Sequence, residues 1–222
     1  AQYLVCPDSN LIKIHQDVPV DRAIFAEPLN VAMGGLKKIR IMPGDNIVIV
    51  GDGPIGMYFC KLCKAMGAGK VIVAGLSEYR RPYITQSGAD RFVIVTEEDL
   101  QTAIREEMPL GADIAIECVG TTINDCIDAV RPGGKVLVVG LNELATQEIC
   151  QHKISRRGID VLGTFIGVHT MQEVANGLNS GLLDFSYLVT HRLPLKDFAL
   201  GLEAMRRSEA LEVILYPWGE IN

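Results

Sequence analysis

The chain has 222 residues, a formal net charge of −6 and a sequence pI of about 5.3. This acidic balance, with basic residues gathered only in pairs such as Arg80-Arg81 and Arg156-Arg157, disfavours nucleic acid and acidic membrane surfaces as partners. No apolar run approaches the roughly 18 residues that a membrane-spanning helix needs. The hydrophobic share of 48% is high for a free-standing domain, so we expect some apolar surface to pack against something outside this chain.

The N-terminal flank, residues 1–22, carries a strand-like run at residues 3–6 and a turn at residues 7–10. Neither belongs to the alternation of strands and helices that follows.

A glycine-rich motif follows the first buried strand of that alternation. An apolar, β-branched run at residues 46–50 leads directly into Gly51-x-Gly53-x-x-Gly56. A helix-like stretch at residues 54–66 then leads to a second apolar run at residues 70–74. Such a motif between a strand and a helix, inside a βαβ unit of roughly 30 residues, predicts dinucleotide binding. A glycine-rich turn in some other α/β protein is the alternative.

Each glycine of the motif has a physical reason. Gly51 allows the tight turn, Gly53 lets the backbone approach a diphosphate, and Gly56 lets the helix pack closely against the strand. The helix N-terminus directs unpaired N–H groups and a positive dipole end at the phosphates. The predicted diphosphate-binding residues are Gly51, Gly53, Pro54, Ile55 and Gly56.

The alternation continues to about residue 165. Five further apolar runs lie at residues 70–74, 92–95, 113–118, 135–139 and 160–165. Helical stretches separate them at residues 82–87, 99–107, 122–130 and, less regularly, 145–156, with a turn at residues 131–135. Runs rich in Val and Ile without polar alternation are typical of parallel strands buried on both faces. The pattern predicts an α/β fold, a Rossmann-type doubly wound sheet of six parallel strands with strand order 3-2-1-4-5-6.

The C-terminal flank does not continue this pattern. It carries a helix at residues 171–179, a strand-like run at 187–191, a helix at 195–207 and a last strand at 212–216. These short strands have no obvious sheet of their own in this chain. Both flanks are therefore left outside the predicted sheet.

The cysteines and histidines give little sign of a metal or redox site. Six cysteines are spread along strand-like and helix-like stretches, which fits a reduced, cytoplasmic protein. Cys60-x-x-Cys63 has the spacing of a redox or zinc pair, but it falls among Met57, Phe59 and Leu62 with no second such pair, so buried packing is the favoured interpretation. The four histidines are scattered and are interpreted as structural or surface residues.

In combination, the motifs resemble the medium-chain dehydrogenase/reductase family, and within it the zinc-type alcohol, polyol and threonine dehydrogenases. The resemblance runs nearly end to end. The segments that carry it lie at residues 27–32, 42–45, 51–56, 87–90, 111–113, 117–120, 131–135, 139–140 and 190–195.

The resemblance implies a division of the chain and an incomplete active site. Residues 1–28 would be a remnant of the catalytic domain, residues 29–167 the NAD(P)-binding domain, and residues 168–222 a segment returning toward the catalytic domain. Most of the catalytic domain, with its zinc ligands and proton relay, is not in this sequence. We therefore expect no catalytic residue here, and an isolated chain that is catalytically incomplete.

One residue corresponds to the family's metal centre. The resemblance places Glu27 in or beside the ligand shell of the catalytic zinc. A catalytic zinc needs three protein ligands, so Glu27 alone would not hold the metal, and zinc is expected only in an intact enzyme. An equally favoured interpretation is that Glu27 stabilises a helix dipole near a helix start.

The end of the second strand predicts the nicotinamide cofactor. Dinucleotide-binding domains that prefer NAD place an Asp or Glu there, where this chain has Gly75. Ser77, Arg80 and Arg81 follow and offer charge-assisted hydrogen bonds to a 2′-phosphate, which predicts NADP. NAD is the alternative, because relatives that use NAD often carry a basic residue at the position of Arg80, and Glu78 offers another carboxylate.

The remaining predicted cofactor residues end later strands, where open α/β sheets bind their ligands. Val119 and Gly120 are assigned to the adenosine side. The resemblance assigns the ends of the fifth and sixth strands to the nicotinamide side: Val139, Gly140, Leu141, Thr164 and Phe165. Ordinary strand-end packing is the alternative for each.

Two departures from the family pattern keep a rival hypothesis open. Glu212 stands where the family usually carries a Lys or Arg that reaches the diphosphate, and Gly75 replaces the usual carboxylate. Both favour a non-catalytic nucleotide-binding or interaction module whose cofactor site has decayed; a zinc-free reductase of the same family is a third possibility. The resemblance also implies a small alcohol or polyol substrate and a homo-oligomer formed through the edge strand at residues 160–166.

Overall fold

The computed structural model describes residues 3–217. This part of the chain divides into two compact units. One is Glu27–Thr170, and the other combines the flanks, residues 3–26 and 171–217.

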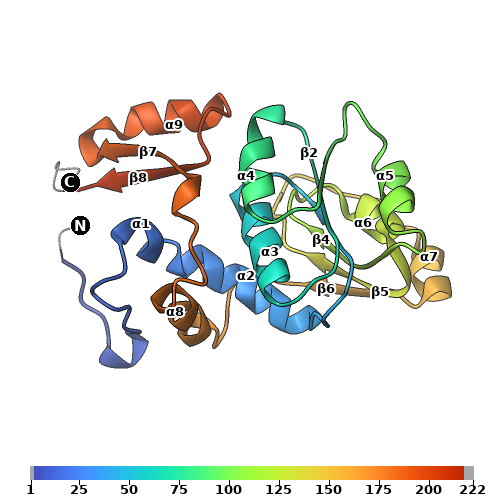
Figure 1. Cartoon of the computed structure of the whole chain (residues 1–222), viewed down its shortest axis with the longest axis horizontal. Coiled ribbons are helices and arrows are strands. Elements are labelled where there is room, and N and C mark those ends of the chain that lie inside the picture. The colour runs from blue at the N-terminus through green and yellow to red at the C-terminus, as the bar shows by residue number, and fades with distance from the viewer. Residues whose placement is uncertain (1–2, 218–222) are drawn as a thin grey trace. The chain divides into compact units, whose positions relative to one another are not determined.

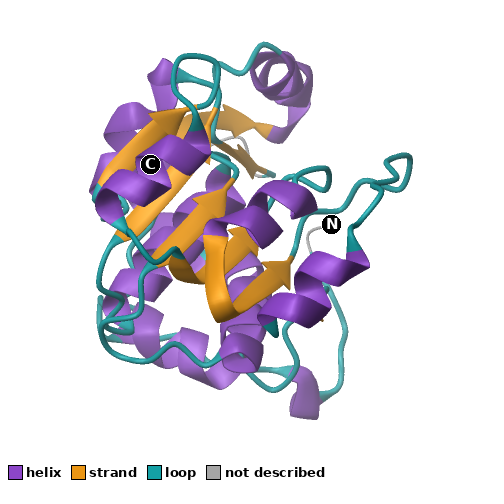
Figure 2. Ribbon diagram, turned by 90° about the vertical axis from the view of Figure 1, so that its right-hand side faces the viewer, coloured by secondary structure: helices purple, strands orange, loops and turns teal. Residues whose placement is uncertain are grey.

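The larger unit is built on a six-stranded parallel sheet, which confirms the predicted fold class. Its strand order is β3-β2-β1-β4-β5-β6, as the alternation predicted. Helices lie on both faces of the strands (Figure 2). In chain order the strands are β1 Ile47–Val50, β2 Val71–Gly75, β3 Arg91–Ile94, β4 Ala112–Glu117, β5 Val130–Val138 and β6 Asp160–Gly163.

The helices of this unit form two layers. Figure 1 shows α3 and α4 on one side of the sheet and α5, α6 and α7 on the other. Their bounds are α2 Ala26–Ile39, α3 Pro54–Ala65, α4 Arg81–Gln86 after the 3-10 turn η2 Glu78–Arg80, α5 Leu100–Glu107, α6 Ile123–Ala129 and α7 Gln151–Arg157.

The central strand is buried on both faces, as its composition predicted. Successive side chains of a strand point to opposite faces. Val48 and Val50 belong to the apolar cluster that includes α5 and α6, while Ile47 and Ile49 point to the other face, and all four are at most 6% exposed. Because a polar side chain on either face would lose its hydration, the strand reads as an unbroken apolar run.

The structure corrects three details of the predicted elements. The turn expected at residues 131–135 is part of β5, whose register with β4 shifts between the pairs Ala112–Val130 and Ile114–Lys135. The helix expected at residues 145–156 is limited to α7, which Gly158 ends in a left-handed conformation (φ 61°). β6 ends at Gly163 and not at residue 165.

The smaller unit contains a parallel β-strand pair, β7 Val189–Pro194 and β8 Glu212–Tyr216, joined through η4 Leu195–Asp197 and α9 Phe198–Arg206. The expectation that these short strands lack a sheet in this chain is therefore wrong, because they pair with each other. The unit's other elements are η1 Asp8–Asn10, α1 Val20–Ala23, α8 Met171–Asn179 and η3 Ser186–Leu188.

The strand expected at residues 3–6 does not form. Tyr3, Leu4 and Val5 are 87–97% exposed and have no neighbouring strand to pair with. Within residues 3–217, no helix has the length and apolar character needed to cross a membrane.

Candidate functional site

The glycine loop after β1 is a tight turn that two of its glycines make possible. Gly51 has φ +124°, a conformation that L side chains rarely adopt, and its N–H donates to the carbonyl of Ala74 at 2.9 Å. A Cβ on Gly56 would lie 2.0 Å from the carbonyl oxygen of Gly51. Helix α3 can therefore start against the end of β1 only with glycine at position 56.

The third glycine faces open space at the start of α3. Gly53 is the N-cap of this 12-residue helix, Pro54 follows it, and no side chain caps the helix. A Cβ on Gly53 would meet nothing within 4 Å. The first N–H groups of a helix have no partner within it, and here they border a space into which an anion fits. This geometry suits the diphosphate of a dinucleotide.

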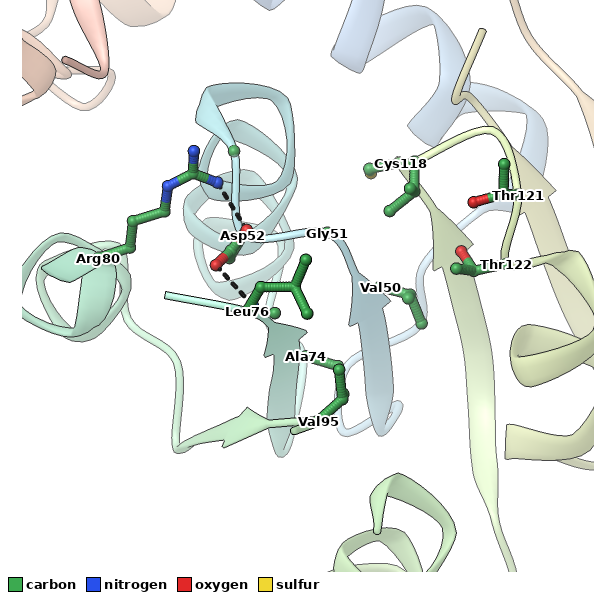
Figure 3. Close-up of a pocket in the computed structure, with 13 residues that line it drawn as sticks. Val50, Gly51, Asp52, Ala74, Leu76, Arg80, Val95, Cys118, Thr121 and Thr122 are labelled. Carbon is green, nitrogen blue, oxygen red and sulfur yellow. Dashed lines mark hydrogen bonds and ion pairs between the residues drawn. The ribbon is translucent and has the colours of Figure 1, made fainter. Parts of the chain in front are cut away.

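A cavity of about 500 Å³ opens beside this loop, at the carboxyl ends of β1, β2 and β4 (Figure 3). Its walls are mostly apolar, as a site for a flat aromatic base would be. The lining residues are Val50, Gly51, Asp52, Gly53, Ala74, Gly75, Leu76, Arg80, Val95, Cys118, Val119, Thr121 and Thr122.

Asp52 places a buried carboxylate in this cavity. The residue is 6% exposed, and its Oδ2 accepts hydrogen bonds from the backbone N–H groups of Leu76 (2.9 Å) and Ser77 (3.1 Å). Its Oδ1 accepts one from Nη1 of Arg80 at 2.6 Å. Figure 3 shows Arg80 reaching Asp52 from its own helical segment. A buried carboxylate is stable only with such donors.

Gly75, the β2 residue at which the sequence lacks a carboxylate, lies directly against Asp52. A Cβ on Gly75 would lie 2.2 Å from the Cβ of Asp52 and 2.4 Å from its Oδ2. Any side chain at position 75 would thus collide with the Asp52 carboxyl group. The absence of a carboxylate on β2 is matched by the presence of one on the glycine loop.

The structure separates the other residues predicted to bind a 2′-phosphate. Arg81 is not among the cavity-lining residues; its Nε donates to Glu78 at 2.5 Å and its guanidinium lies 5.2 Å from the ring centroid of Phe92. This hydrogen bond lowers the pKa of Glu78. Ser77 uses its backbone N–H for Asp52 and does not line the cavity either.

A second buried carboxylate shapes the turn after β4. Oε1 of Glu117 accepts from the backbone N–H groups of Val119 (3.1 Å), Gly120 (2.7 Å) and Thr122 (3.2 Å), and from the Thr122 hydroxyl (2.6 Å). Glu117 is 1% exposed. These bonds hold the loop that presents Val119, Thr121 and Thr122 to the cavity.

The residues predicted at the ends of β5 and β6 lie outside the lining of this cavity. Gly140 packs against the β4 turn, where a Cβ would lie 2.1 Å from the backbone N of Gly120. Leu141 and Phe165 are 71% and 67% exposed. Thr164 is buried, and its hydroxyl has no hydrogen-bond partner among the residues that the structure describes.

The cysteines behave as packed side chains, as predicted for the Cys60-x-x-Cys63 pair. Both residues are fully buried in α3 and unpaired. Burial raises the pKa of Cys60 to about 12 and that of Cys63 well above its usual value. Cys118 lines the cavity, and burial raises its pKa as well. These thiols are protonated at neutral pH and are poor metal ligands or nucleophiles.

The residues present do not fit a zinc site. Glu27 is exposed in the first turn of α2, where a carboxylate stabilises the helix dipole. Within residues 3–217, no group of three or more His, Cys, Asp or Glu side chains is placed to hold a metal ion.

Of the predicted cofactor residues, Gly51, Gly53, Gly75, Arg80 and Val119 line the cavity. Pro54, Ile55 and Gly56 form the first turn of α3 beside it. Sequence reasoning missed Asp52 and Glu117. The sequence did contain one usable signal for both residues. Each is a carboxylate at the end of an apolar strand, and a carboxylate buried there needs hydrogen-bond donors.

The fold and the glycine loop define a Rossmann-type dinucleotide-binding domain. The zinc-binding dehydrogenase family matches residues 54–180, and the chain belongs to this family. The resemblance to zinc-type medium-chain dehydrogenases is thereby confirmed.

Individual relatives agree with this assignment. L-threonine 3-dehydrogenase of Aeromonas hydrophila subsp. hydrophila is 33% identical over 220 residues, covering 97% of this chain and 64% of the relative. The chain thus spans less than two thirds of the length of such relatives.

Two solved structures share the fold. A protein assigned as a zinc-binding dehydrogenase of Sinorhizobium meliloti 1021, bound to NADP, matches with a TM-score of 0.88 and 24% identity, covering 95% of this chain and 64% of that one. An alcohol dehydrogenase (rspB) of E. coli CFT073, complexed with NADH, matches with a TM-score of 0.88 and 20% identity, covering 95% of this chain and 63% of that one.

Proposed function

We propose that this chain is the NAD(P)-binding portion of a zinc-type alcohol or polyol dehydrogenase, which transfers hydride between an alcohol and a nicotinamide cofactor. The observation that carries the proposal is the open face of Gly53 at the uncapped N-terminus of α3, beside a cavity at the carboxyl ends of β1, β2 and β4. Family membership supports the same activity.

In this proposal the chain's own residues bind and orient the dinucleotide. The backbone N–H groups at the start of α3, from Gly53, Ile55 and Gly56, bind the diphosphate. The apolar walls formed by Val95 and Val119 hold the adenosine half. The nicotinamide ring, when bound, supplies the acceptor or donor of hydride.

The predicted residues beyond β5 and β6 would belong to the nicotinamide half of this site. They are Val139, Gly140, Leu141, Thr164 and Phe165. The exposure of Leu141 and Phe165 supports their availability to a ligand, and the unpartnered hydroxyl of Thr164 supports a polar contact.

We assign no catalytic residue and no zinc-dependent step to this chain, because its described residues do not provide the ligands. The flanks, residues 3–26 and 171–217, would belong to the catalytic domain of the complete enzyme. The incomplete coverage of the relatives supports this division.

The proposal includes a reducing compartment and a homo-oligomer. Cys6 and Cys150 are exposed and unpaired, which is typical of cytoplasmic proteins. β6 is at the edge of the sheet, and Val161, Phe165 and Ile166 beside that edge are 38–67% exposed. An exposed apolar edge of this kind favours pairing with a second copy of the chain.

Fluorescence titration of the chain with NADH and NADPH tests the proposal. Saturable binding of either cofactor in the micromolar range is the expected result. Binding of neither would contradict it and favour the alternative, a non-catalytic module with a decayed cofactor site. Glu212, at the start of β8, is the residue that supports this alternative. Gly75 no longer supports it, because Asp52 supplies a carboxylate at the same place.

A further inference from the structure

We propose that Asp52 fills the position of a cofactor 2′-phosphate and thereby makes the chain select NAD(H) over NADP(H). This inference rests on the proposed function, and it departs from the NADP that the sequence predicted. It depends on three observations: the donors that bind Asp52, the space that Gly75 leaves for it, and the acceptor capacity that remains on its carboxylate.

The donors around Asp52 form an anion-binding site. Two consecutive backbone N–H groups, those of Leu76 and Ser77, converge on Oδ2 at 2.9 and 3.1 Å. The guanidinium of Arg80 binds Oδ1 at 2.6 Å. Backbone N–H groups and an Arg after β2 are the donor types that would bind a phosphate on the adenosine ribose. In this chain a carboxylate of the protein occupies them.

The position of this carboxylate matches the end of β2, where NAD-binding domains carry an acidic residue. Oδ2 of Asp52 lies 2.4 Å from the place of a Cβ on Gly75. An acidic side chain on residue 75 would have to place its own carboxyl group in the same small space. Asp52 therefore delivers a negative charge from the glycine loop to the place where β2 would otherwise deliver it.

The remaining capacity of the carboxylate suits a ribose hydroxyl. A carboxylate has about four acceptor positions, and three hydrogen bonds to Asp52 leave about one. A neutral hydroxyl can donate to that position. A 2′-phosphate would meet a like charge in a nearly buried site and would have to displace Asp52 from Arg80.

Removal of the carboxylate tests the inference. In Asp52→Ala the Leu76 and Ser77 N–H groups and the Arg80 guanidinium lose their anion. We expect NADPH to bind roughly tenfold to hundredfold more tightly than to the unaltered chain, and NADH to bind more weakly. Asp52→Asn keeps the shape, removes the charge and replaces one of the two acceptor oxygens by an NH2 donor. It should shift the NADPH-to-NADH affinity ratio in the same direction by a smaller factor, and it answers the question if Asp52→Ala does not fold.

The matched control is Glu97→Gln. Glu97 is an exposed carboxylate two residues beyond Val95 of the cavity wall, so its removal changes the net charge equally without opening the donor site. The NADPH-to-NADH affinity ratio of this variant should stay within about twofold of the ratio for the unaltered chain, since exposed charges are screened. Affinities are measured by nicotinamide fluorescence, so no turnover is required.

The outcomes separate this inference from the proposed function. Tighter NADH than NADPH binding in the unaltered chain, reversed or levelled in Asp52→Ala, supports the role of Asp52. Tighter NADPH binding in the unaltered chain, or an equal ratio in the unaltered chain and Asp52→Ala, overturns that role while the proposed function stands. Binding of neither cofactor overturns both.

Discussion

The side chain of Asp52 occupies the space that a side chain on Gly75 would need: a Cβ on Gly75 would lie 2.2 Å from the Cβ of Asp52. The two residues belong to different strand ends, yet each determines what the other can be. Gly75 has to lack a side chain because Asp52 is there, and Asp52 can reach the Leu76 and Ser77 amides because Gly75 has none.

This relationship predicts that the carboxylate can be moved from one strand end to the other. Gly75→Asp alone should lower the free energy of unfolding by about 1–3 kcal/mol, because it overpacks the site and brings two carboxylates together. The double variant Asp52→Gly, Gly75→Asp removes the Cβ of residue 52 as well as its carboxylate, so it should regain most of that loss and bind NADH. Urea unfolding and NADH titration of the three chains measure both effects. Equal destabilisation of the single and double variants would contradict the predicted exchange.

The glycines of the loop should respond differently to the same substitution. Gly56→Ala would place a Cβ 2.0 Å from the backbone oxygen of Gly51 and should cost about 2 kcal/mol or more of stability. Gly53→Ala meets no protein atom within 4 Å and has φ −79°, so stability should change by no more than about 0.5 kcal/mol.

The affinity for NADH tests the role of Gly53 directly. Gly53→Ala should fold normally and lose about tenfold or more in NADH affinity, because the methyl group enters the space assigned to the diphosphate. Thermal unfolding and fluorescence titration check the pair. If Gly53→Ala bound NADH as tightly as the unaltered chain does, the assignment of the diphosphate to this position would be contradicted.

The hydrogen bonds of Glu117 to the turn after β4 should contribute to the stability of the fold. Glu117→Ala leaves three backbone N–H groups and the Thr122 hydroxyl without their acceptor and should cost about 2–4 kcal/mol of stability. Glu117→Gln keeps an oxygen at the same place and should cost less. Denaturant unfolding compares the two, and equal losses would show that the hydrogen bonds of Oε1 are not the source of the effect.

Because burial raises the pKa of its thiols, we predict that the free energy of unfolding of the chain falls at alkaline pH. An ordinary cysteine has a pKa of 9.0, and burial raises that of Cys60 to about 12. Between these values the unfolded chain releases the thiol proton and the folded chain retains it, so stability present below pH 9.0 is lost as the pH rises toward about 12.

The predicted slope is about 1.4 kcal/mol per pH unit for each such thiol. Urea unfolding of the unaltered chain and Cys60→Ala between about pH 9 and pH 11 measures it, because the titration of lysines and tyrosines is common to both chains. Parallel curves for the two chains would contradict the buried, protonated state of Cys60.

Much of the fold could be predicted from the sequence because its determinants are local. The Val- and Ile-rich runs of β1 and β2 specify buried parallel strands, and the spacing of Gly51, Gly53 and Gly56 specifies the turn between strand and helix. For helix α2, the sequence suggested only a helix start near Glu27 and not the full 14-residue helix. The glycine at position 35 of this helix has a tertiary reason, because a Cβ there would lie 2.9 Å from the side chain of Leu137.

The candidate site was predicted less completely, for a related reason. Asp52 occupies a variable position of the glycine motif, and its partners Leu76 and Arg80 come 24 and 28 residues later in the chain. No local pattern indicates that they meet. Arg81, which the sequence assigned to a 2′-phosphate, is directed instead by Glu78 and Phe92, a choice that only packing determines.

The most direct test of the central claim is a crystal structure of this chain with NADH. We expect the diphosphate within hydrogen-bond distance of the backbone N–H groups at the start of α3, over the open face of Gly53, with the adenosine ribose beside Asp52. A diphosphate bound elsewhere, or a glycine loop that side chains close off from the cofactor, would contradict the account.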